Sequence, residues 1–181
     1  LIFGLPFPFS PIQIIFTELL MDLASSTIFI TEEAEPGIMQ RSPRRREKFL
    51  SRAVAKRILR NMAGLTAAIL VVYFVSLILG YAVDSARTAA FATWLLGHIL
   101  LAMNLKQEKT PLLKQGLFSN TFALAWLLGM IAFVIAMTQW PFIRSVLGTT
   151  GLSGSQWLMV MVGSLLASMW MEVGKWVHGE R

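Results

Sequence analysis

Long apolar runs limit what this sequence can fold into more than any other feature. Five runs are long enough to cross a bilayer, because about 20 helical residues at about 1.5 Å each span the hydrocarbon. The runs are continuously apolar and do not alternate with period two, which favours helices over barrel strands. The sequence therefore predicts an all-α integral membrane protein with five transmembrane helices, covering residues 9–31, 58–83, 87–105, 120–139 and 156–177.

Basic residues gather between the first two runs. Nine of the sixteen Lys and Arg residues lie between Arg41 and Arg60, and the formal net charge is +6. This placement is typical of a cytoplasmic loop, here residues 32–57, and not of a protein that binds nucleic acid. With that loop inside, the C-terminus is cytoplasmic, whereas the "VDSAR" hairpin and the "WPFIRSVLGTTGLSGS" loop are external.

Several kinds of chemistry are excluded by what the sequence lacks. There is no cysteine, which rules out disulfides and thiolate metal sites. No Gly-rich phosphate loop, no nucleophile beside a base and no metal-ligand cluster is present. We therefore predict no catalytic residue and no cofactor site. The start "LIFGLPFPFSP" lacks the basic residues of a signal peptide, so we expect a piece of a longer protein.

Two carboxylates interrupt the first apolar run. Glu18 and Asp22, in "FTELLMDLASST", are four residues apart and project from one helix face. A carboxylate in the middle of a membrane span has to face protein, water or a cation, and such acids usually mark an ion or proton route. The alternative is a protonated pair that hydrogen-bonds between helices. Two carboxylates also fall short of the six to eight oxygens that Ca²⁺ prefers, so other helices would have to complete a site.

Other polar residues in the runs have two interpretations each. His98 either contributes to a proton or cation route or is a packed, hydrogen-bonded histidine. Asn104 is expected to join helices. Glu172 and Lys175 are three residues apart and suggest a structural ion pair, with Lys175 reaching toward the headgroups.

Basic residues also precede the second run. The segment "SRAVAKRILRN" suggests that the second helix extends into the cytoplasm. Its charges either set the topology alone or form a lipid or partner site.

Four segments in order resemble the C-terminal membrane region of the P-type cation-transporting ATPases, in the calcium-pump-like branch. "LPFPFSPIQIIFTELLMD" is similar to the start of the family's sixth helix, and "EPGIMQRSPRR" to the following loop, with Ser42 replacing a proline. "SARTAAFATWLL" and "NLKQEKTPLLKQGLFSN" resemble the eighth helix and the loop after it. "SQWLMVMVGSLLASMWMEVGK" resembles the tenth helix. The resemblance covers nearly the whole chain and implies helices six to ten of a ten-helix transport domain.

The resemblance also implies a cation site. In calcium pumps, Asn-x-x-Thr-Asp on the sixth helix and a Glu on the eighth are ligands. Carried over, the Asp falls on Asp22, the Asn on Glu18, the Thr on Met21 and the Glu on His98. A thioether and an imidazole are softer ligands than the oxygens that Ca²⁺ prefers. The expected cation ligands are therefore Asp22 and Glu18, with His98 as a further candidate, and the ion is left open between H⁺, Ca²⁺ and a monovalent cation.

By the same resemblance, ATP and Mg²⁺ would be bound by an upstream, N-terminal part of the same pump, which carries the phosphorylated Asp. The expected partners are that part, the lipid bilayer and an inorganic cation, with no nucleic acid. The expected location is a prokaryotic plasma membrane. Two other functions stay open: an ATP-independent ion carrier or channel that uses the same two acids, and a non-catalytic membrane subunit.

Overall fold

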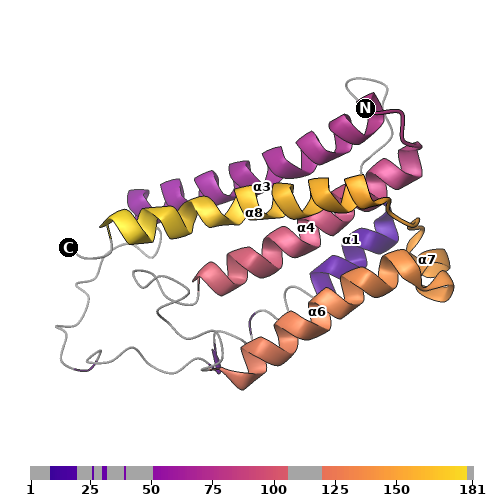
Figure 1. Ribbon diagram of the computed structural model, residues 1–181. Coiled ribbons are helices and arrows are strands. Elements are labelled where there is room, and N and C mark those ends of the chain that lie inside the picture. Colours follow the sequence, from indigo (N-terminus) through magenta and orange to yellow (C-terminus); the bar gives the residue numbers. More distant parts are fainter. Residues whose placement is uncertain are drawn as a thin grey trace.

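The computed structural model describes residues 9–19, 26, 30, 31, 39, 51–105 and 120–178. Within these residues the chain is helical and contains no strand, as the apolar runs predicted. The helices of the described residues, labelled in Figure 1, are α1 (Pro11–Glu18), α3 (Arg52–Ile78), α4 (Val83–Leu105), α6 (Thr121–Gln139), α7 (Pro141–Leu147) and α8 (Gly154–His178).

Three of the described helices are long and apolar enough to cross a membrane: Val54–Ile78, Val83–Leu105 and Thr121–Gln139. They confirm an all-α membrane chain, whereas the count of five spans stays a prediction. The run 156–177 coincides with most of α8, which has 25 residues. The run 9–31 is represented by α1 at its start, and most of the predicted loop 32–57 lies outside the described residues.

Helix α3 begins well before its apolar part. Ser51 is its N-cap, and the Ser51 side chain accepts a hydrogen bond from the Val54 backbone N–H at 3.3 Å. At about 1.5 Å per residue, its 27 residues extend about 40 Å, whereas the hydrocarbon core is about 30 Å thick. The structure thus shows a helix that begins at Arg52, before the apolar run, whereas its extension into the cytoplasm stays a prediction.

The turn between α3 and α4 lies earlier than the sequence suggested. Helix α3 ends at Ile78, and Gly80 adopts a positive φ of 82°, which glycine tolerates at no steric cost. The prediction that "VDSAR" forms the hairpin is wrong, because these residues are the first turn of α4. The negative charge of Asp84 in this first turn is stabilised by the helix dipole, and Asp84 pairs with Arg87 at 3.6 Å.

Part of the predicted loop after α6 is also helical. Pro141 occupies the first turn of α7, where its missing N–H costs nothing, and Gly148 closes the helix with a φ of 62°. Helix α7 packs against the end of α6, and both lie at the same end of the molecule as the α3–α4 turn (Figure 1).

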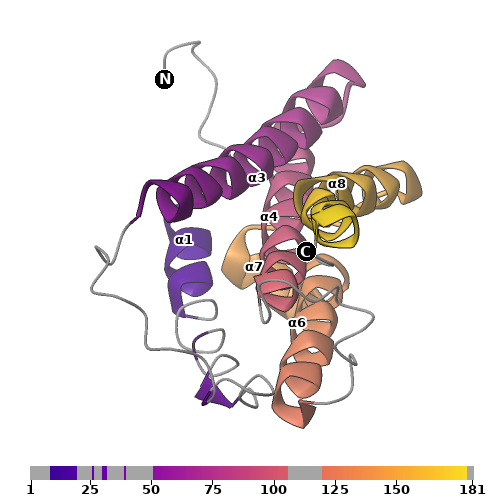
Figure 2. The same ribbon diagram turned by 90° about the vertical axis from the view of Figure 1, so that its left-hand side faces the viewer.

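Helix α4 is the centre of the packing. Helices α3 and α8 pack along it and along each other, and α6 packs on it from another side (Figures 1 and 2). Small residues on α4, including Ala89, Ala92 and Thr93, are completely buried and let the neighbouring helices approach closely. In lipid, such van der Waals packing replaces the hydrophobic effect as the force that joins helices. Larger side chains complete this core: Phe91, Leu95, Ile99, Met103, Met137, Leu147 and Val160.

Candidate functional site

Glu18 is the last residue of α1, and its side chain is exposed. Asp22 and Met21 lie outside the described residues, so the predicted pairing of Asp22 with Glu18 stays a prediction. The structure instead describes how the turns before Glu18 are held in place.

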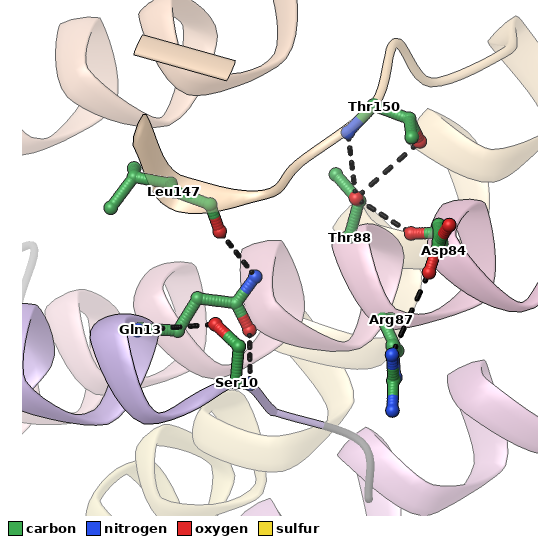
Figure 3. Close-up of polar contacts among 7 residues, drawn as sticks. All are labelled: Ser10, Gln13, Asp84, Arg87, Thr88, Leu147 and Thr150. Atoms are coloured by element: carbon green, nitrogen blue, oxygen red, sulfur yellow. Dashed lines mark hydrogen bonds and ion pairs between the residues drawn. The ribbon is translucent and has the colours of Figure 1, made fainter. Parts of the chain in front are cut away.

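A capping box holds the start of α1. The Ser10 side chain accepts from the Gln13 backbone N–H at 3.4 Å, and the Gln13 side chain accepts from the Ser10 N–H at 3.0 Å. The Gln13 side chain also donates from Nε2 to the carbonyl oxygen of Leu147, the last residue of α7, at 3.1 Å (Figure 3). Gln13 is only 2% exposed, so one side chain caps α1 and ties it to α7.

Aromatic contacts fix the sides of α1. The Phe9 ring stacks on Trp94 of α4, with centroids 4.7 Å apart, and the Phe16 ring stacks on Phe133 of α6 at 5.1 Å. Thr17 is buried and donates its hydroxyl to the Gln13 carbonyl oxygen at 2.8 Å. Gln13 and Thr17, four residues apart, share the buried face of α1, whereas Glu18 is exposed.

His98 lies on α4 and is half-buried. Its Nδ1 is 3.1 Å from the carbonyl oxygen of Trp94, and the two rings are 5.7 Å apart. Because residues four apart share a helix face, His98 is on the face of α4 that meets Phe9. Within the described part of the chain, no group of three or more His, Asp or Glu residues could hold a metal ion.

A polar network at the α7 end ties α4 to the segment before α8. The Thr88 hydroxyl donates to the Asp84 carbonyl oxygen at 2.8 Å and accepts from the Thr150 N–H at 2.9 Å (Figure 3). Sequence reasoning did not single out Thr88 or Gln13. The capping box could have been found, since "SPIQ" carries Ser and Gln three residues apart with Pro after the cap.

Tyr81 lies in the α3–α4 turn, outside the membrane-spanning segments. Ser153 donates to its phenol oxygen at 3.2 Å, and the Ser155 hydroxyl lies 2.5 Å away. These hydrogen bonds, first from Ser153 and then from Ser155, lower the pKa of Tyr81 below its ordinary value of 10.0, because they stabilise the phenolate.

The other end of α8 carries a buried ion pair. Glu172 Oε1 and Lys175 Nζ are 3.1 Å apart, which confirms the predicted pair. The prediction that Lys175 reaches toward the headgroups is wrong: Lys175 is only 8% exposed, and its Nζ donates to the Asn104 carbonyl oxygen on α4 at 2.6 Å. Asn104 does join the helices, but through its backbone, since its side-chain amide donates to Leu100 within α4.

A cavity of about 270 Å³ lies between α4, α6 and α8. Its walls are apolar side chains apart from Ser164, and the Ser164 hydroxyl donates to the Thr93 carbonyl oxygen at 3.2 Å. Hard cations need several oxygen ligands, so this cavity does not suit a cation.

Comparisons with known proteins agree with the helical membrane architecture. The family described as "Cation transporting ATPase, C-terminus" matches residues 6–177. The chain is 25% identical to a calcium-transporting ATPase of Bacillus subtilis over 167 residues. This alignment covers 89% of this chain and 18% of that protein. It is also 25% identical over 181 residues to calcium-transporting ATPase 1 of Lactococcus lactis, covering 99% of this chain and 20% of that protein.

A fungal relative, calcium-transporting ATPase 1 of Yarrowia lipolytica, is 25% identical over 171 residues, which are 94% of this chain and 18% of that protein. The chain thus spans about a fifth of the length of the curated relatives that it matches. Because the family match covers nearly all of its residues, this chain belongs to the C-terminal membrane region family of the cation-transporting P-type ATPases.

Proposed function

We propose that this chain is the membrane transport half of an ATP-driven cation pump and supplies part of its intramembrane cation site. The observation that carries this proposal is the family match over residues 6–177. ATP and Mg²⁺ binding and phosphorylation would belong to the N-terminal part of the same pump. This is consistent with a chain that spans about a fifth of its relatives' length.

The proposed site consists of Asp22 and Glu18, with His98 as a further ligand or proton carrier. The position of Glu18 supports it. Gln13 of α1 bonds to α7 and Phe16 packs on α6, whereas Glu18 lies at the end of the helix and is exposed. A carboxylate within the membrane has to meet protein, water or a cation. Helices from the N-terminal part would cover Glu18 and provide the remaining oxygen ligands.

The transported ion is proposed to be Ca²⁺, H⁺ or a monovalent cation. The relatives' names favour Ca²⁺, whereas a carboxylate at Glu18 and an imidazole at His98 suit H⁺ or a monovalent cation at least as well. In either case, two states of the pump would bind the ion with different affinities, and phosphorylation would switch between them.

Five spans are proposed, corresponding to helices six to ten, with the C-terminus in the cytoplasm. The basic residues support this orientation, since nine of the sixteen lie between Arg41 and Arg60. A prokaryotic plasma membrane is the proposed location, and two of the three relatives named above are bacterial.

The test is the ATP hydrolysis rate of the full-length protein in lipid vesicles. Ca²⁺, Na⁺ and K⁺ are added singly, and each series is repeated at several pH values. We expect one cation, or H⁺, to stimulate hydrolysis saturably. A full-length sequence without an Asp-Lys-Thr-Gly-Thr segment upstream, or hydrolysis that responds to none of these ions, would contradict the proposal.

A further inference from the structure

We propose that the end of α3 before its apolar part, together with Trp170 of α8, forms a binding site for the phosphate headgroup of an anionic phospholipid. The site consists of Arg52, Lys56 and Arg60 on α3 and the indole ring of Trp170. This inference is independent of the proposed transport function.

The three cations form one row along α3. They are spaced four residues apart, which places them on the same side of the helix, and all three are exposed. Within the described part of the chain, the carboxylates of Asp84 and Glu172 pair with other bases, Arg87 and Lys175. The row therefore presents three positive charges to its surroundings.

Arg60 is held in place by a neighbouring helix. Its guanidinium carbon lies 4.5 Å from the centroid of the Trp170 ring, a cation–π contact. Trp170 is itself held in place: its Nε1 donates to the Ala167 carbonyl oxygen at 3.1 Å, and its indole lies beside Gly64 of α3. A guanidinium held on a ring face keeps its N–H donors available to a phosphate at little further entropic cost.

The depth of the row matches that of lipid headgroups. Arg60 is 18 residues before Ile78, the last residue of α3, so it lies about 27 Å along the helix from that end. The hydrocarbon core is about 30 Å thick, which places Arg60 at its border and Lys56 and Arg52 just beyond. Large apolar side chains lie beside the row, since Leu59 is 64% and Met62 59% exposed. This combination of exposed cations and exposed aliphatic groups fits a lipid better than an acidic protein segment.

The test is native mass spectrometry of the full-length protein, titrated with phosphatidylglycerol or phosphatidylcholine of identical acyl chains. We expect Arg60→Gln to weaken the tightest phosphatidylglycerol site about fivefold, and the triple variant R52Q/K56Q/R60Q by two orders of magnitude or so. Phosphatidylcholine binding should stay the same. Arg144→Gln, on α7 near the opposite end of the described helices, is the matched control and should change neither lipid.

Trp170→Leu distinguishes specific binding of the headgroup from non-specific attraction of an anionic lipid to basic residues. It removes no charge, yet it should weaken phosphatidylglycerol binding about two- to fivefold because Arg60 loses its support. The folded state of each variant is checked by its thermal unfolding midpoint.

Three outcomes would overturn the proposal. One is unchanged phosphatidylglycerol binding in the triple variant, and another is an equal loss for both lipids. The third is displacement of the lipid by millimolar inorganic phosphate, because that would indicate a site for free phosphate.

Discussion

The ammonium nitrogen of Lys175 lies 2.6 Å from the carbonyl oxygen of Asn104, so a buried cation on α8 donates a hydrogen bond to the last turn of α4. The last carbonyls of a helix lack partners within the helix and carry the negative end of its dipole. Lys175 supplies a donor and a positive charge there, and Glu172 balances the charge at 3.1 Å. This contact joins two helices that are far apart in sequence.

Glu172→Gln should destabilise the folded chain strongly, because it leaves Lys175 buried without its carboxylate. Breaking one partner of a buried pair typically costs about 3–5 kcal/mol. Asp84→Asn is the matched control, since its pair with Arg87 has the same spacing but an Asp84 side chain that is 70% exposed. Its effect should be below about 1 kcal/mol. The stabilities of the two variants are compared by thermal unfolding of the full-length protein in one detergent. An equal loss of stability in both would contradict the role of burial.

Gly163→Ala should loosen the packing of α3, α4 and α8. A Cβ at this position would lie 2.9 Å from Val72 Cγ2 and 3.4 Å from Thr93 Cγ2, and both β-branched side chains are stiff. We expect a loss of about 1–3 kcal/mol, typical of overpacking. Gly129→Ala on α6 meets no atom within 4 Å and should be neutral or stabilising by up to about 1 kcal/mol. Thermal unfolding midpoints provide the comparison, and a neutral Gly163→Ala would show that these helices are not closely packed.

Gln13→Leu should free α7 from α1. The variant removes the donor to the buried Leu147 carbonyl and one half of the capping box, with an expected loss of about 1–3 kcal/mol. Ser10→Ala disturbs the cap alone and should cost less, about 1 kcal/mol. Hydrogen exchange is the measurement: amides of α7 and residues 148–153 should exchange faster in Gln13→Leu, whereas α3 should not change. Unaltered exchange in α7 would show that this hydrogen bond does not anchor it.

Tyr81 should ionise at a lower pH than an ordinary tyrosine. Its folded-state pKa is lowered by Ser153 and Ser155, so any stability gained from the phenolate is fully present above the unfolded-state pKa near 10. It is lost as the pH falls through the lowered folded-state pKa. The phenolate absorbance of wild type minus that of Tyr81→Phe gives the titration of this residue. Replacing both serines by alanine should return the midpoint toward 10, and a midpoint at or above 10 in wild type would contradict the contacts.

Helices were the part of the fold that local sequence predicted well. Apolar runs mark α3, α4, α6 and α8, because a helix in lipid satisfies its own backbone hydrogen bonds. The α3–α4 turn was misplaced, because Asp84 and Arg87 look like loop residues although they stabilise the first turn of α4. Helix α7 was missed because its seven residues lie in a segment rich in Gly, Ser and Thr.

Contacts between distant segments were harder to predict. The spacing of Glu172 and Lys175 predicted their pair. The hydrogen bond from Lys175 to the Asn104 carbonyl could not be predicted in this way, because it depends on how α4 and α8 pack. The same limit holds for the cation site. Spacing predicts that Glu18 and Asp22 share a face, whereas the proposed further ligand His98 lies on α4, so bringing it to them depends on how the helices pack.

Cation-stimulated transport by the full-length protein carrying Asp22→Asn tests the central claim most directly. The amide keeps the size of the side chain and removes its charge, and Asp84→Asn makes the same change in the exposed α4 turn. Both variants are compared with wild type for transport into vesicles, with thermal unfolding as the check of folding. The account predicts that folded Asp22→Asn loses cation-dependent ATP hydrolysis and transport while Asp84→Asn retains both. Wild-type transport by Asp22→Asn would contradict it.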